Sequence, residues 1–125
     1  MSALTFTIGP DLWISANDRP HWADKAKRTR ALRHMGLVQT RVANLRNLGT
    51  CHVAAFIGYP RNGKADPSNA FPTCKALIDG MTDAGCWPDD DHTNVIGPTY
   101  LRDPSTKRAG IHTVRFVMTS QEVPW

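Results

Sequence analysis

CHVAAFIGY, at residues 51–59, sets the architecture of this chain of 125 residues. The stretch contains Val53, Phe56 and Ile57 and almost nothing polar, which is typical of a β-strand in the interior of a sheet. A turn precedes the stretch, and the loop sequence PRNGK follows it. We therefore expect a central strand, with Asp66 just beyond its end.

The segment before this strand, residues 22–45, predicts one long amphipathic helix. Its apolar residues recur at three- and four-residue steps and should face the core: Leu32, Met35, Val38, Val42 and Leu45. The other faces carry a single acid, Asp24, and six basic residues: Lys25, Lys27, Arg28, Arg30, Arg33 and Arg41. Such a face is either a solvated surface or a surface that follows DNA phosphates, and the local excess of positive charge adds weight to the second.

Four further segments complete the predicted secondary structure. Residues 4–8 alternate apolar and polar side chains, which predicts a short first strand. Residues 72–83 predict a second helix, and residues 94–101 and 111–118 predict two more strands. The chain therefore predicts one domain, residues 1–125, of the α+β class, with about four strands in a mixed sheet packed with two helices.

Helix ends are predicted from residues that satisfy free backbone groups. Asn17 or Asp18 is placed to cap the first helix, and Ser68 or Asn69 to cap the second. Gly85 follows the second helix, where a glycine fits the C-terminal cap.

The cysteines and the N-terminus predict a cytoplasmic protein. Cys51, Cys74 and Cys86 are odd in number and widely spaced, which argues against a disulfide framework and for small buried thiols in a reducing compartment. Residues 1–5 lack the charge of a secretory signal, and no run of 18 apolar residues occurs.

An acidic stretch from Asp66 to Asp91 stands out on a chain whose net charge is +4. It holds six of the 11 acidic residues, namely Asp66, Asp79, Asp83, Asp89, Asp90 and Asp91. If the chain after Gly85 folds back along the second helix, Asp89 or Asp90 comes beside Asp66. Two carboxylates and a substrate phosphate would suit Mg²⁺, with Lys75 neutralising charge on the phosphate. The alternative is that these carboxylates only cap turns or form surface ion pairs, such as the helical pair Lys75–Asp79.

The acidic stretch resembles the signature of a known nuclease family. The elements are Asp66-Pro67-Ser68-Asn69, Lys75, Asp79-Gly80 and Ala84-Gly85-Cys86-Trp87-Pro88-Asp89-Asp90. In this order they resemble the RusA-type Holliday junction resolvases, small phage and prophage endonucleases whose motif is Asp-x-Asp-Asn, a lysine, then a helix ending in Gly and an Asp-Asp pair. Residues 15–19 resemble the Asn-rich loop of that family, and the likeness spans residues 4–118.

The resemblance implies a homodimeric, Mg²⁺-dependent enzyme, with Mn²⁺ as a substitute, that cuts four-way DNA junctions in the cytoplasm of a bacterial host. It implies Asp66, Asp90 and Lys75 as catalytic residues and Asp66 and Asp90 as metal ligands. The supporting residues would be Ser68, Asn69 and Asp89. The basic first helix and the loops would contact DNA through Arg19, Lys25, Lys27, Arg28, Arg30, Arg61 and Lys64.

Position 68 departs from the family motif and leaves a second hypothesis open. The family has an aspartate where this chain has Ser68, and a short insertion separates Asn69 from Lys75. A neutral hydroxyl is a weak metal ligand, so the departure predicts weaker Mg²⁺ binding. The alternative is therefore a protein that binds DNA junctions without cutting them. A third hypothesis is a basic structural or regulatory protein with no preference for junctions.

Two tryptophans have alternative roles. Trp22 and Trp87 could stack on unpaired bases at an opened junction. The more common role of such residues is packing in the core or at a dimer interface, and we favour it for both.

Overall fold

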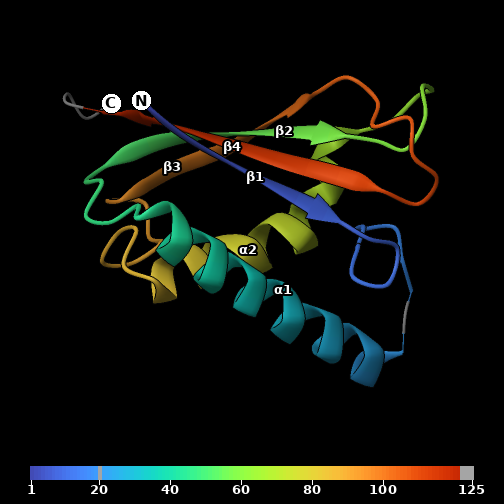
Figure 1. Cartoon of the computed structure of the whole chain (residues 1–125), viewed down its shortest axis with the longest axis horizontal. Helices are drawn as coiled ribbons and strands as arrows, with labels where there is room; N and C mark the ends of the chain where they lie inside the picture. Colours follow the sequence, from blue (N-terminus) through green and yellow to red (C-terminus); the bar gives the residue numbers. More distant parts are fainter. Residues whose placement is uncertain (20, 122–125) are drawn as a thin grey trace.

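A computed structural model describes residues 1–19 and 21–121 of the chain. Two helices cover one face of a four-stranded sheet (Figure 1). The elements are β1 (Ser2–Ile8), α1 (Trp22–Ala43), β2 (Cys51–Gly58), the 3₁₀-helix η1 (Pro67–Ala70), α2 (Phe71–Asp83), β3 (Val95–Arg102) and β4 (His112–Ser120). The α+β class, the mixed sheet and the two helices are as predicted. In the described part of the chain, no helix is long and apolar enough to cross a membrane.

Strand β2 lies in the interior of the sheet, whose order is β1-β4-β2-β3. It pairs antiparallel with β4 and parallel with β3, so that Ala55 lies opposite both Phe116 and Tyr100. Its alternate residues, such as Val53 and Ile57, are fully buried in the core. The predicted central strand is therefore confirmed.

The two helices touch at a pair of glycines. A Cβ added to Gly36 of α1 would lie less than 3.0 Å from the backbone oxygen of Leu77. A Cβ added to Gly80 of α2 would lie even closer to the backbone oxygen of Arg33. Only glycine fits at this crossing, which brings the two helix backbones into direct contact.

This crossing overturns part of the predicted core face of α1. The buried residues of the helix are Leu32, Gly36 and Thr40, spaced four apart. Val38 and Val42, which the apolar pattern assigned to the core, are 42% and 83% exposed. The pattern misled because the contact row contains a glycine and a threonine, whose place in the core comes from close helix packing and not from hydrophobicity.

The predicted cap of α1 is also wrong. His21 caps the helix, and its Nδ1 accepts the backbone N–H of Ala23 at 3.2 Å. Asp18 instead accepts the N–H of Ser15 at 2.8 Å, which closes the loop before the helix. Asn17 lies in the same loop, four residues before the cap.

The core lies between the sheet and the helices and contains all three thiols. Cys51, Cys74 and Cys86 are buried and free, as predicted. Burial raises the pKa of Cys74 and Cys86 to about 12, so both thiols stay protonated. Trp87 is 1% exposed and is a core residue, whereas Trp22 is 76% exposed on the first turn of α1.

Candidate active site

Asp66 stands at the start of η1 and caps it. Its Oδ1 accepts the backbone N–H of Ser68 at 3.0 Å and the Ser68 hydroxyl at 2.7 Å. These bonds, the hydroxyl first, lower the pKa of Asp66, so its exposed carboxylate is ionised at neutral pH. Asp66 caps η1 only, because the N-cap of α2 is Ala70, which has no side-chain hydrogen bond to the helix. The predicted capping of the second helix by Ser68 or Asn69 is therefore wrong. Because both bonds end on Oδ1, Oδ2 is the oxygen that they leave open.

The chain after α2 folds back along the helix, as the two-carboxylate hypothesis requires. Gly85 has a φ of 88°, the left-handed conformation expected of a C-terminal glycine. Cys86 then donates its N–H to the oxygen of Met81, and buried Trp87 donates its ring N–H to the Thr82 hydroxyl at 2.7 Å. These bonds aim the following aspartates at the exposed face of α2.

Lys75 lies between two carboxylates on that face. Its Nζ donates to Oδ1 of Asp79 at 2.8 Å and to Oδ2 of Asp90. The bonds to Asp79 and then to Asp90 raise the pKa of Lys75, and Lys75 lowers the pKa of Asp90. The predicted pair of Lys75 and Asp79 is confirmed. Asp90, 15 residues further along the chain than Lys75, also bonds the same ammonium group. The site thus carries a fixed cation between two carboxylates.

The remaining acids of the stretch have separate partners. Asp89 accepts the backbone N–H of Asp90 at 2.7 Å and so orients it. Asp91 accepts from the backbone and hydroxyl of Thr93 and from the Asn94 amide. Asp91 thus caps a turn, which was the alternative interpretation of the acidic run.

Asp66 shares a small cavity with the loop before α1. The cavity, about 140 Å³, is lined by Trp13, Ser15, Asn17, Tyr59, Ala65, Asp66, Asn69 and Ala70. Asn69 fixes the loop, because its backbone oxygen accepts the N–H of Ala16 at 2.8 Å. Two segments that the sequence singled out, residues 15–19 and 66–69, therefore meet at one place.

The carboxylates form two sets in this structure. Asp66 bonds to Ser68, whereas Asp90 bonds to Lys75. Across residues 1–19 and 21–121, there is no group of three or more His, Cys, Asp or Glu side chains that could hold a metal ion. A metal ion shared by Asp66 and Asp90 stays a prediction.

Most of the predicted DNA-contacting residues are exposed. Lys25, Lys27 and Arg30 are exposed on α1, and Arg19 is exposed in the loop before it. Arg28 is the exception. Its guanidinium pairs with Asp24 at 2.9 Å and donates to two backbone oxygens of the loop at residues 10–13. Arg28 therefore anchors that loop to α1, and its contact with DNA stays a prediction.

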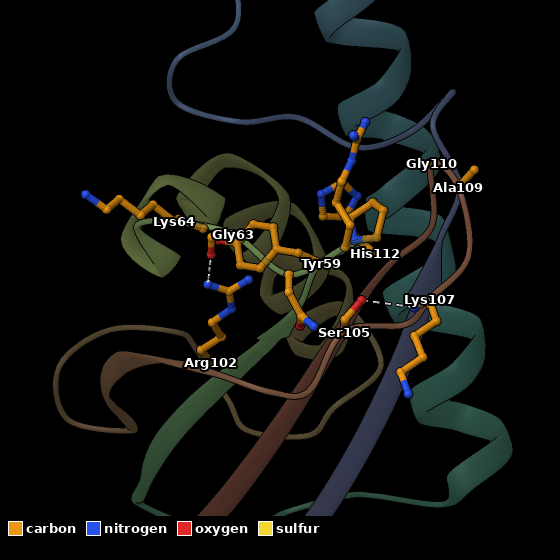
Figure 2. A pocket seen from close by; sticks show the side chains of 13 residues that line it. Tyr59, Gly63, Lys64, Arg102, Ser105, Lys107, Ala109, Gly110 and His112 are labelled. Atoms are coloured by element: carbon orange, nitrogen blue, oxygen red, sulfur yellow. Dashed lines mark hydrogen bonds between the residues drawn. The ribbon is translucent and has the colours of Figure 1, made fainter.

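The sequence did not predict a larger groove that contains Arg61 and Lys64. The groove has a volume of about 840 Å³ and lies between residues 59–65 and 102–112. Figure 2 shows the side chains that line it. Parallel pairing of β2 with β3 brings these loops together, and Thr106 donates its N–H to the oxygen of Tyr59 at 2.8 Å. The basic residues of both loops were visible in the sequence, but their pairing was not.

Comparison with known proteins adds no assignment. The chain matches no protein-family model and no curated protein sequence.

Proposed function

We propose that this protein is a Mg²⁺-dependent endonuclease that cuts branched DNA, four-way junctions above all, by phosphodiester hydrolysis. The observation that carries the proposal is the contact between Lys75 and Asp90. It joins the middle of the acidic stretch to its end, as an active site built from Asp66, Lys75 and Asp90 requires. The resemblance to the RusA-type resolvases supports the same three residues.

Lys75 supplies the positive charge that phosphoryl chemistry needs. Its pKa is raised, so it stays protonated wherever the enzyme operates. Asp79 and Asp90 hold its ammonium group in place, and a preorganised cation stabilises the charge that develops on the phosphate. The amine is therefore an electrostatic group and not a general base.

The charge balance of the site explains the need for a divalent cation. Two carboxylates surround one ammonium group, so the cluster of Lys75, Asp79 and Asp90 has a formal charge of −1. Ionised Asp66 adds another negative charge close to the start of α2. A DNA phosphate would be repelled by this set unless a cation joined it.

The donor atoms fit Mg²⁺. Asp66 presents Oδ2, and Asp90 presents the oxygen that does not bond Lys75. Mg²⁺ is commonly held by one or two carboxylates with waters and substrate phosphate, so Asp66 and Asp90 would hold it together with the DNA. When bound, the ion would activate a water and polarise the phosphodiester.

The DNA would be held by the exposed basic surface of α1 and the neighbouring loops. Lys25, Lys27, Arg30 and Arg19 are exposed and would contact the phosphates. A homodimer would place two such sites on the two strands of a junction. The RusA-type resemblance further suggests a phage or prophage protein that works in the cytoplasm of its host.

A second function, junction binding without cleavage, is favoured by one specific observation. Ser68 occupies the position of the family's second aspartate and bonds directly to Asp66. Its hydroxyl takes up one carboxylate oxygen instead of adding a ligand. In this case the fold and the basic surface would bind branched DNA while the site stayed inactive.

A cleavage assay separates these functions. The protein is incubated with a labelled four-way junction or a linear duplex of matched sequence, in Mg²⁺, Mn²⁺ or EDTA. The endonuclease predicts nicked duplex products from the junction with a divalent ion only. Asp66→Asn, Asp90→Asn and Lys75→Ala should abolish them, whereas Asp83→Asn, which removes a carboxylate outside the site, should not.

Binding to the same DNA completes the test. Junction-selective binding with no product for the wild type would support the second function and reject the first. Equal affinity for junction and linear duplex would reject both and favour the basic structural protein.

A further inference from the structure

The large groove is built from two loops that are tied to each other. Thr106 of one loop donates to the backbone oxygen of Tyr59 in the other at 2.8 Å. The guanidinium of Arg102 donates to the oxygen of Gly63, as Figure 2 shows. Contacts across the groove thus hold both walls, and the space of about 840 Å³ between them is a defined feature of the fold.

The groove is strongly basic. Among the residues that the structure describes, its lining contains Arg61, Lys64, Arg102 and Lys107 and no acidic side chain. Arg102 is occupied with Gly63, but none of the ion pairs among the described residues involves the other three cations. Figure 2 shows Lys64 and Lys107 on opposite sides of the groove. Such a channel is suited to a chain of phosphates that passes between its walls.

The groove also contains planar side chains. Tyr59 and His112 lie at its centre in Figure 2, with their rings edge to face at 5.5 Å. His112 stacks on Trp13 at 3.8 Å, and Arg102 lies 5.1 Å from the centre of the Tyr59 ring. Burial lowers the pKa of His112, so its imidazole is neutral at pH 7. These rings can stack on a base only if that base has left the duplex, because the neighbouring base pairs cover both faces of a base inside it.

The groove leads directly to the candidate active site. Tyr59 and Ala65 line both the groove and the small cavity that contains Asp66. The Tyr59 hydroxyl lies 3.4 Å from the backbone oxygen of Asp66, to which it donates. A strand in the groove would therefore continue toward the Asp66 carboxylate.

We propose that this groove binds an unpaired DNA strand, with phosphates on Arg61, Lys64 and Lys107 and a base stacked on the planar side chains around Tyr59. The inference takes its partner, DNA, from the proposed function. It adds that the strand reaching Asp66 is locally opened. The basic face of α1 would hold the paired arms, and the groove would hold the single strand between them.

Fluorescence anisotropy with a labelled oligothymidine in EDTA tests the groove without any cutting. Lys64→Ala/Lys107→Ala should weaken binding by about tenfold and lower the salt slope by about 1.4, because each single-strand phosphate contact contributes roughly 0.7. The matched control is Arg41→Ala/Arg46→Ala, which removes two exposed charges away from the groove. Equal loss of affinity in the two double variants would overturn the groove as the binding site.

A fully abasic strand of the same length tests the stacking. Tyr59→Leu should weaken oligothymidine binding by about tenfold and leave binding of the abasic strand unchanged. Tyr59→Phe, which keeps the ring, should bind oligothymidine like the wild type. If Tyr59→Leu weakens both strands equally, the base-stacking role is wrong. Because these measurements contain no metal ion, they succeed or fail independently of the cleavage assay.

Discussion

The Ser68 hydroxyl donates a 2.7 Å hydrogen bond to Oδ1 of Asp66, the carboxylate that follows β2. The backbone N–H of Ser68 bonds the same oxygen, so both groups fix one side of the carboxylate. This arrangement keeps Asp66 ionised and oriented, but it gives a metal ion no additional charge. We therefore expect the residue at position 68 to decide how strongly the proposed site binds a metal ion.

Ser68→Asp should strengthen metal binding and increase cutting. A second carboxylate beside Asp66 raises the ligand charge, which should lower the Mg²⁺ concentration for half-maximal cleavage by about tenfold or more. Ser68→Ala is the control, because it removes the hydroxyl bond without adding charge and should not lower that concentration. Titrating Mg²⁺ in the junction-cleavage assay measures both variants. An unchanged or higher requirement in Ser68→Asp would count against a metal ion at Asp66.

Lys75→Ala should abolish most activity with little effect on stability. Loss of a preorganised cation aimed at the phosphate typically lowers the rate by about 10²- to 10³-fold. The Lys75 side chain is 50% exposed, so its ion pairs contribute under about 1 kcal/mol to the free energy of unfolding. Single-turnover cleavage and urea unfolding separate the two effects. A large loss of stability would indicate a structural role instead.

The sequence was informative where a signal is local. The apolar run at residues 51–59 predicted the central strand, and four-residue spacing predicted the pair of Lys75 and Asp79. The sequence did not predict features that depend on how distant segments pack together. Gly36 has no side chain to produce an apolar pattern, yet it marks the helix contact. The basic groove depends on the parallel pairing of β2 with β3, which no local pattern encodes.

Gly80→Ala should destabilise the fold because its methyl group would overlap the backbone of α1 at Arg33. Forcing a methyl into a closed contact costs about 1–3 kcal/mol. Gly9→Ala is a matched control, because a Cβ at Gly9 meets nothing within 4 Å. Urea unfolding should show a lower midpoint for Gly80→Ala and Gly36→Ala only.

The double variant Gly36→Ala/Gly80→Ala tests whether the two glycines share one contact. Once the first methyl has separated the helices, the second should cost less than it does alone, so the two effects should not add. Full additivity would show that each glycine is constrained separately.

Acid should weaken the fold partly through the pair of Arg33 and Asp83, which joins α1 to α2. Arg33 donates two hydrogen bonds to the carboxylate, at 2.6 and 2.8 Å, and these bonds lower the pKa of Asp83 from 3.8. A carboxyl group whose pKa is lower in the folded protein than in the unfolded chain stabilises the fold at pH values above its unfolded-state pKa. That stabilisation is lost as the pH falls through the pKa of the group in the folded protein. The loss should therefore occur below about pH 4. Because both side chains are more than a third exposed, it should be well under about 1 kcal/mol.

Asp83→Asn isolates this contribution from those of the other aspartates. The variant should be slightly less stable than the wild type at pH 6, because the asparagine lacks the charge that pairs with Arg33. The two proteins should then converge as the pH falls below 4, where Asp83 of the wild type becomes protonated. Urea unfolding at a series of pH values measures the difference. A constant difference across the range would show that the carboxylate's charge is not what joins the helices.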